Sequence, residues 1–121
     1  MSMSAADKSR LVPVIDRDRL RAKLASGQAF KLVMAASDFG FRAKHIPGSL
    51  HVGVHGRDLS HLAPDDDIVV YCSNLDCNAS KALIKKLVEL GYRNVSHYAG
   101  GLIDWEAAGL PVEGDWAPES P

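Results

Sequence analysis

The chain has 121 residues, 46% of them hydrophobic and 24% charged, which is the size and composition of one ordinary globular domain. Its 14 Lys and Arg residues nearly balance its 15 Asp and Glu residues, and they form no basic patch with interleaved aromatic side chains. These features exclude electrostatic binding of nucleic acid or of an anionic membrane. The first ten residues lack the apolar core of a signal peptide, and no apolar run is long enough to span a bilayer, so we expect a cytoplasmic protein.

The first part of the chain alternates between strand-like and helix-like segments. Residues 11–15 predict a short strand, which Pro13 favours at a sheet edge because proline has no N–H to donate. Asp16 is typical of a helix cap, and Gly27 ends the basic helix that follows it. Residues 30–36 are mainly apolar and predict a buried strand.

A short helical turn that begins at Ser37 or Asp38 comes next, and the same alternation continues after it. The β-branched and aromatic run at residues 68–71 predicts a second buried strand, and Gly91 is typical of the end of a helix. The remaining predicted elements are strands at residues 49–52 and 94–98 and helices at residues 79–90 and 102–108.

Strands separated by helical segments imply right-handed crossover connections, and hence a mostly parallel sheet with helices on both faces. The predicted fold class is therefore α/β. We expect one domain over residues 11–114, with flexible segments at residues 1–10 and 115–121.

Cys72 ends the predicted strand at residues 68–71 and opens a polar loop that leads into a helix. Ligands of open α/β sheets bind beyond the carboxyl ends of the strands, and the free N–H groups at a helix N-terminus favour an anion there. A thiolate is such an anion, so this position indicates a reactive cysteine. A buried cysteine that serves packing alone is the alternative.

Three motifs along the chain carry a specific resemblance. They are AKHIPGSLHV, then VVYC followed by a polar loop and a helix ending in LGY, and then AGGLIDWEAAGLPVEG. In this order and at these spacings they resemble a single rhodanese-like domain of the sulfurtransferase family. The resemblance covers roughly residues 11–114.

The resemblance implies a parallel five-stranded sheet and a cysteine at the end of its central strand that carries a persulfide. This cysteine corresponds to Cys72, and the main-chain N–H groups of the following loop would surround its sulfur. The implied substrate-binding loop consists of Ser73, Asn74, Leu75, Asp76, Cys77, Asn78 and Ala79.

The chain departs from the common family pattern in this loop. The serine that starts the helix corresponds to Ser80, so the loop is two residues longer than usual and has no glycine or arginine. Met34, Ala35 and Ala36 replace the Asp-Val-Arg run that usually precedes HIPG. Because the loop carries Asp76 and no basic residue, we expect the thiosulfate dianion to be a poor sulfur donor.

Three roles stay open for Cys77, which is a resolving thiol, half of a regulatory disulfide with Cys72, or a bystander. His51, His55 and His61 do not have the spacing of a compact metal site, so we predict no metal and no cofactor. His45, which precedes Ile-Pro-Gly, is interpreted as stabilising a turn.

The leading hypothesis is a sulfurtransferase that takes sulfane sulfur from a small-molecule or protein persulfide donor and passes it from Cys72 to a thiol or cyanide-like acceptor. The second is a non-catalytic rhodanese-like binding or sensor module, which Asp76 and the missing loop arginine favour. Phosphatase or arsenate reductase chemistry ranks last, because it needs a basic group near the oxyanion. The sequence does not predict an oligomeric state.

Overall fold

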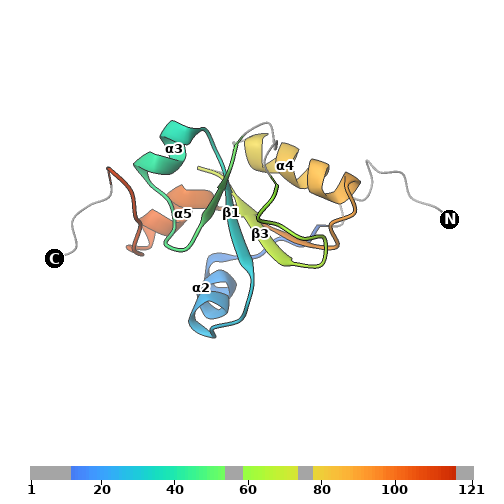
Figure 1. Ribbon diagram of the computed structural model, residues 1–121. Helices are drawn as coiled ribbons and strands as arrows, with labels where there is room; N and C mark the ends of the chain where they lie inside the picture. Colours follow the sequence, from blue (N-terminus) through green and yellow to red (C-terminus); the bar gives the residue numbers. More distant parts are fainter. Residues whose placement is uncertain (1–11, 54–58, 74–77, 117–121) are drawn as a thin grey trace.

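A computed structural model of the protein describes residues 12–53, 59–73 and 78–116. These residues form four strands and four helices, in the order α2-β1-α3-β2-β3-α4-β4-α5 (Figure 1). The strands are β1 (Lys31–Ala35), β2 (Leu50–Val52), β3 (Asp67–Tyr71) and β4 (Asn94–Tyr98). The helices are α2 (Arg17–Ala25), α3 (Asp38–Ala43), α4 (Asn78–Glu89) and α5 (Gly101–Ala107). The predicted α/β class is confirmed.

The four strands form one parallel sheet in the order β2-β1-β3-β4. The expectation of five strands is wrong. The segment predicted as the first strand lies beside β4 and makes only an isolated bridge between Val14 and His97. Two hydrogen bonds hold it, from Ile15 N to His97 O at 3.0 Å and from His97 N to Pro13 O at 2.9 Å. Asp16 then caps a helix, so the pairing ends after one bridge.

Caps predicted from the sequence are present at two helices. Asp16 accepts a hydrogen bond from Arg19 N at 2.8 Å, and Ser37 Oγ accepts one from Gly40 N at 3.1 Å. Each side chain thereby satisfies one of the N–H groups that a helix start leaves without a partner. The sequence left Ser37 and Asp38 as alternatives for the start of α3, and Ser37 is the residue that caps this helix.

Helices cover both faces of the sheet, and each face has its own core. One cluster lies between the sheet and α4, where the helix contributes Leu83, Ile84 and Leu87. The other lies on the opposite face, where Leu20 of α2 and Trp105 of α5 pack against β1, β3 and β4. Figure 1 shows α4 on one side of the strands and α5 and α2 away from it. The described helices include none long and apolar enough to cross a membrane.

The HIPGS segment is fixed to the sheet through the hydroxyl group of Tyr71. This hydroxyl accepts a hydrogen bond from Ile46 N at 2.9 Å and lies 2.7 Å from Ser49 Oγ. Ser49 Oγ donates to Ile46 O at 2.6 Å, so its single proton is used and Tyr71 donates to Ser49. Ile46 and Ser49 therefore form a hydrogen-bond network with Tyr71 of β3, although Tyr71 lies 25 and 22 residues further along the sequence.

The end of the described chain lies against α3. Glu113 and His45 exchange two backbone hydrogen bonds of 2.8 and 2.9 Å. Asp115 N donates to Arg42 O at 2.8 Å, and Trp116 N donates to Ala43 O at 2.9 Å. The first two residues of the predicted C-terminal tail are thus hydrogen-bonded to the domain, whereas residues 117–121 lie outside the described part of the chain.

Candidate active site

The sheet has a topological switch point between its two inner strands, β1 and β3. From β1 the chain passes through α3 to the outer strand β2, and from β3 it passes through α4 to β4 on the opposite side. Because all strands are parallel, their carboxyl ends meet at one edge. A crevice between two such diverging connections is where open α/β sheets bind ligands.

Cys72 lies at this switch point, immediately after the last residue of β3. Cys72 is buried, with only 3% of its surface exposed. Its carbonyl oxygen accepts a hydrogen bond from Leu102 N, and the carbonyl oxygen of Ser73 accepts one from Ile103 N, both at 2.9 Å. These two carbonyl groups, which would repel an anionic sulfur, are therefore held by the start of α5.

Cys72 is disulfide-bonded in this structure. The bonded sulfur is the oxidised form of the thiolate that sulfur transfer requires. A two-electron reduction would have to precede any attack by Cys72 on a donor.

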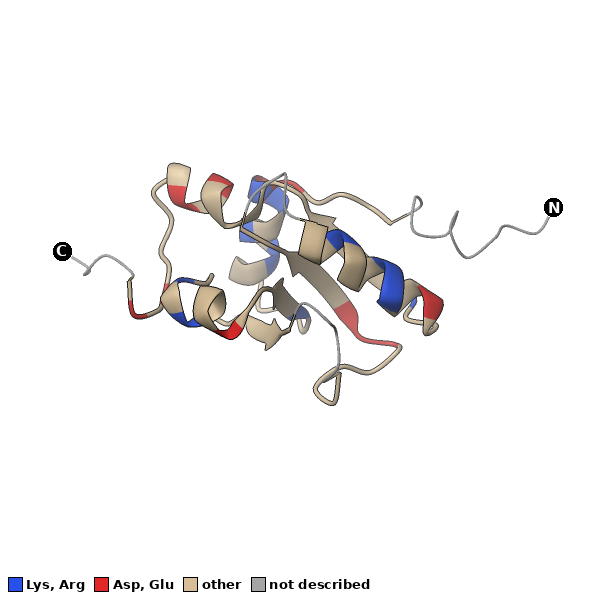
Figure 2. Cartoon of the chain, turned by 90° about the horizontal axis from the view of Figure 1, so that it is seen from above, with Lys and Arg blue, Asp and Glu red and all other residues tan. Residues whose placement is uncertain are grey.

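The predicted loop is described at its two ends only. Ser73 follows Cys72 and is exposed, and Asn78 and Ala79 form the first turn of α4. Asn74, Leu75, Asp76 and Cys77 lie outside the described residues. Lysines recur along α4, where Figure 2 shows blue segments, and Lys81 is the first of them after the loop.

A polar pair that the sequence reading did not include lies beneath the first turn of α4. Ser80, 1% exposed, places its Oγ 3.1 Å from Nε2 of His97 on β4. Burial, and then the nearby charge of Lys81, lower the pKa of His97, so its imidazole is neutral at pH 7. The sequence signal was the alternation within β4, which puts His97 on the same face as the core residue Val95.

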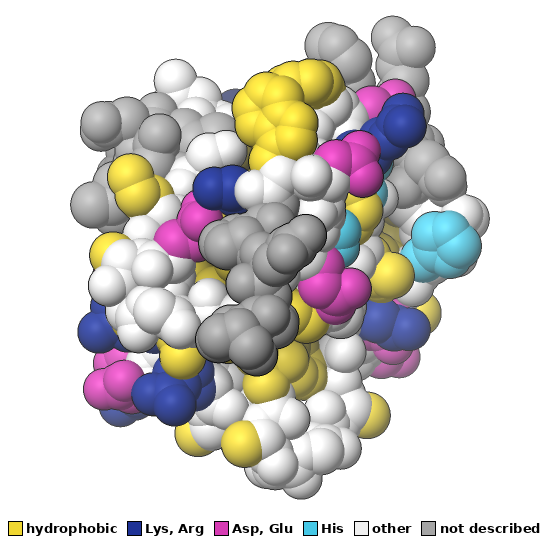
Figure 3. Space-filling model, turned by 90° about the vertical axis from the view of Figure 1, so that its left-hand side faces the viewer, with side chains coloured by type: hydrophobic (Ala, Val, Ile, Leu, Met, Phe, Trp, Pro, Cys, Tyr) yellow, Lys and Arg dark blue, Asp and Glu magenta, His cyan; other side chains and the backbone are white. Residues whose placement is uncertain are grey.

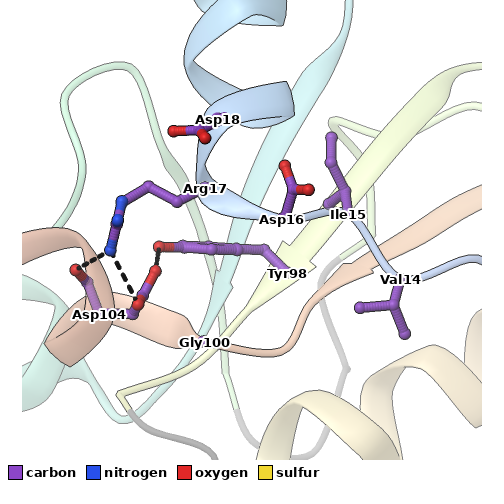
Figure 4. Close-up of a pocket in the computed structure, with 8 residues that line it drawn as sticks. All are labelled: Val14, Ile15, Asp16, Arg17, Asp18, Tyr98, Gly100 and Asp104. Carbon is purple, nitrogen blue, oxygen red and sulfur yellow. Dashed lines mark hydrogen bonds and ion pairs between the residues drawn. The ribbon is translucent and has the colours of Figure 1, made fainter.

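A second polar group lies at the carboxyl end of β4, where a cavity of about 350 Å³ opens between α2 and α5 (Figure 4). Tyr98 and Arg17 converge on Asp104, with the tyrosine hydroxyl donating to Oδ2 at 2.5 Å and Arg17 Nη1 donating to Oδ1 at 3.0 Å. Burial, and then the bond to Asp104, raise the pKa of Tyr98. A Cβ at Gly100 would lie 2.8 Å from the Asp104 side chain, which explains the first glycine of the pair in AGG.

The structure describes two of the histidines considered as metal ligands, His51 and His61. His51 Nε2 is 2.6 Å from Ala36 O, and its ring stacks on Phe41 at 5.0 Å. His45, interpreted as stabilising a turn, is 2.8 Å from Phe41 O through Nδ1. His61 is exposed, and His55 lies outside the described residues. Within the described ranges, no group of three or more His, Cys, Asp or Glu side chains is arranged to hold a metal ion.

A parallel sheet with helices on both faces and a cysteine at the end of an inner strand define a class of small α/β domains that present a thiol at a switch point. The family model for the rhodanese-like domain matches residues 16–108, which is most of the chain. The protein therefore belongs to the rhodanese-like domain family, and the resemblance seen in its motifs is confirmed.

Curated relatives come from two kinds of protein. An HTH-type transcriptional regulator of Mycobacterium tuberculosis is 32% identical over 75 residues, which are 60% of this chain and 33% of the regulator. The chain thus spans about a third of that regulator's length. A sulfurtransferase of Allochromatium vinosum is 29% identical over 104 residues, which are 84% of this chain and 95% of the relative.

Solved structures agree with the family assignment. The rhodanese-like domain of a protein from Anabaena, determined in solution by NMR, has a TM-score of 0.74 and 27% sequence identity to this chain. The match covers 92% of this chain and 86% of the Anabaena domain. The match to the rhodanese-like family model and the similarity to the sulfurtransferase of Allochromatium vinosum together support an activity of the sulfurtransferase type.

Proposed function

We propose that the protein is a sulfurtransferase in which Cys72 carries sulfane sulfur as a persulfide. The observation that carries this proposal is the position of Cys72 at the carboxyl end of an inner strand, at the switch point and before the start of α4. Helix dipole and loop N–H groups at such a place lower the pKa of a thiol and stabilise an anionic persulfide. The similarity to a sulfurtransferase over nearly its whole length supports the same chemistry.

In the proposed cycle, the reduced Cys72 thiolate attacks the outer sulfur of a persulfide donor, R–S–SH. The donor's S–S bond breaks, R–S⁻ leaves, and a Cys72 persulfide forms. An acceptor thiolate then attacks the outer sulfur of this persulfide, takes it, and returns Cys72 as a thiolate. The two displacements need no external oxidant or reductant once the Cys72 disulfide has been reduced.

The test is intact-mass and peptide mass spectrometry of the reduced protein after incubation with a persulfide donor. We expect the mass of one sulfur atom on the peptide that contains Cys72, and none in Cys72→Ser, which changes sulfur to oxygen at nearly the same size. Cys77→Ser is the matched control, because the persulfide on Cys72 does not depend on a second thiol. Equal sulfur loading in Cys72→Ser would remove Cys72 from the mechanism.

The finer proposal is that thiosulfate is a poor donor and that a less charged polysulfide or a protein persulfide is a better one. The loop sequence carries Asp76 and no Lys or Arg, so the thiosulfate dianion would meet a carboxylate without a compensating side-chain charge. We expect Asp76→Arg to lower the KM for thiosulfate and to change turnover with a persulfide donor much less. A wild-type protein that prefers thiosulfate would contradict this loop-charge argument.

A second candidate function is a binding or sensor module with negligible turnover. The similarity to a transcriptional regulator favours it, because the matching region there is a third of a longer protein. Steady-state sulfur transfer separates the two candidates. A sensor module would load one sulfur and then stop in the presence of excess acceptor thiol, whereas an enzyme would turn over repeatedly.

A further inference from the structure

An open cavity of about 440 Å³ lies against α3, and Cys72 is not among its lining residues. Figure 3 views the molecule from the side on which α3 and α5 lie, and it shows large hydrophobic side chains standing out of the surface beside acidic and basic ones. The lining residues come from α3 and from the end of the described chain. They are Asp38, Phe39, Arg42, Ala43, Asp115 and Trp116.

Two aromatic rings form a corner of this cavity. Phe39 and Trp116 meet edge to face, with ring centroids 5.1 Å apart and planes at 87°. They are nevertheless 66% and 64% exposed. Phe39 is held by α3, and the backbone of Trp116 is fixed by its hydrogen bond to Ala43 O. A pair of large rings that is held in place while its faces stay in water is typical of a recognition surface.

The charges around this aromatic corner favour a cation. Two carboxylates, Asp38 and Asp115, line the cavity with one guanidinium, that of Arg42, so the lining has a formal net charge of −1. The Asp38 side chain is 87% exposed, and its Oδ1 lies 3.4 Å from Nδ1 of His51. The faces of aromatic rings carry negative potential as well, so the rings and the carboxylates attract the same kind of ligand.

We propose that this cavity binds a small organic ammonium ion, with its methyl or methylene groups against Phe39 and Trp116 and its charge toward Asp38 and Asp115. An anion would be repelled by both carboxylates. A neutral apolar molecule would contact the rings and gain nothing from the acidic groups. The volume is that of a small-ligand site.

The expected affinity is modest, because the site is open. A cation over an exposed aromatic ring keeps much of its water, so each ring contributes little. We expect a dissociation constant in roughly the millimolar range or weaker.

The probe is choline, titrated into the full-length protein at constant ionic strength and followed by NMR. The indole N–H resonance of Trp116 should shift and saturate. The indole of Trp105, which is buried and bonded to Pro111 O at 2.8 Å, should stay in place and serves as an internal control. The neutral isostere 3,3-dimethylbutan-1-ol is the matched ligand, and we expect it to bind at least several-fold more weakly.

Charge variants sharpen the test. Asp115→Asn should weaken choline binding several-fold, and Arg42→Gln should strengthen it, because the first removes an attractive charge and the second a repulsive one. Phe39→Leu keeps an apolar side chain at this exposed position but removes one ring face, and it should weaken choline more than the neutral isostere. Cys72→Ser should bind choline as the wild type does, which separates this site from the proposed sulfur chemistry.

Two outcomes would overturn the proposal. One is equal shifts of Trp116 with choline and with the neutral isostere, which would mean an apolar surface without charge recognition. The other is a Trp116 indole N–H resonance that does not shift at a choline concentration about ten times the expected dissociation constant.

Discussion

The two faces of the sheet are stabilised in different ways. On the α4 face, the fully buried members of the core are all aliphatic, and their packing needs no polar partner. On the opposite face, three buried aromatic residues each use a polar group. Tyr71 is bonded to the HIPGS segment, Tyr98 to Asp104, and Trp105 to the backbone at Pro111. Apolar packing thus fixes α4 on one face, whereas hydrogen bonds from buried aromatic side chains fix the HIPGS segment, α5 and the backbone after α5 on the other.

This difference separates two tasks within a small domain. The aliphatic face fixes α4, whose first turn follows the loop of the candidate site. The aromatic face fixes segments around the sheet, because each hydroxyl or indole N–H is hydrogen-bonded to a residue outside its own strand or helix. Four measurements would break or sharpen this comparison.

The largest effect is expected from Leu87→Ala on the aliphatic face. Leu87 is fully buried between α4 and the sheet. Truncating such a side chain removes apolar contact and leaves a cavity, so we expect a loss of about 2–5 kcal/mol in the free energy of unfolding. Urea denaturation measures it. Leu90→Ala, at a residue 55% exposed just after the same helix, is the control and should change stability by less than about 0.5 kcal/mol.

On the aromatic face, Tyr71→Phe should cost about 1–3 kcal/mol, because it leaves the buried N–H of Ile46 without its acceptor. A pH series isolates the hydroxyl. Burial raises the pKa of Tyr71 from 10.0 to about 12, so the folded state holds this proton over a range in which the unfolded state loses it.

The hydroxyl's contribution is therefore complete below pH 10 and falls by on the order of 2–3 kcal/mol between pH 10 and about 12. We expect the stability difference between wild type and Tyr71→Phe to shrink over this window. Tyr98 is present in both proteins, so its own titration cancels. A constant difference up to pH 12 would mean that Tyr71 is not buried as described.

A smaller effect is expected at a polar pair of the aliphatic face, Ser80 and His97. The pKa of His97 is lowered below 6.5 in the folded protein, so the unfolded state binds the proton more readily. Stability from the neutral imidazole is complete above pH 6.5 and is lost as the pH falls through the folded pKa. The stability difference between wild type and His97→Asn should decrease from pH 7 to pH 5. A difference that grows on acidification would contradict the direction of this shift.

The aliphatic face was the more predictable of the two. Periodicity located the apolar stripe of α4, and the run at residues 68–71 located β3, because each signal depends on neighbours within one or two turns. The position of Cys72 at a strand end followed from the same run. The caps at Asp16 and Ser37 were equally local.

What could not be predicted depended on contacts between distant segments. The bonds of Tyr71 to Ile46 and of Ser80 to His97 join residues 25 and 17 positions apart, and their geometry exists only after the strands have paired. The prediction of a fifth strand was wrong for a related reason. Its sequence was strand-like, but the number of bridges it makes with β4 was set by the helix cap at Asp16, which turns the chain away after Ile15.

The smallest effect is expected where the aromatic face reaches solvent, at the ion pair of Arg17 and Asp104. Its atoms are 3.0 Å apart, yet both side chains are 37% exposed. Water and salt screen such a pair, and ordering two side chains costs entropy, so Arg17→Gln should change stability by about 0–1 kcal/mol. Tyr98→Phe should cost more, because Asp104 then loses the hydroxyl that donates from the interior. A double-mutant cycle over Arg17 and Tyr98 would show whether Asp104 is held mainly from inside the fold. A larger loss from Arg17→Gln than from Tyr98→Phe would mean that the aromatic face is fastened at its surface and not by its buried hydroxyl groups.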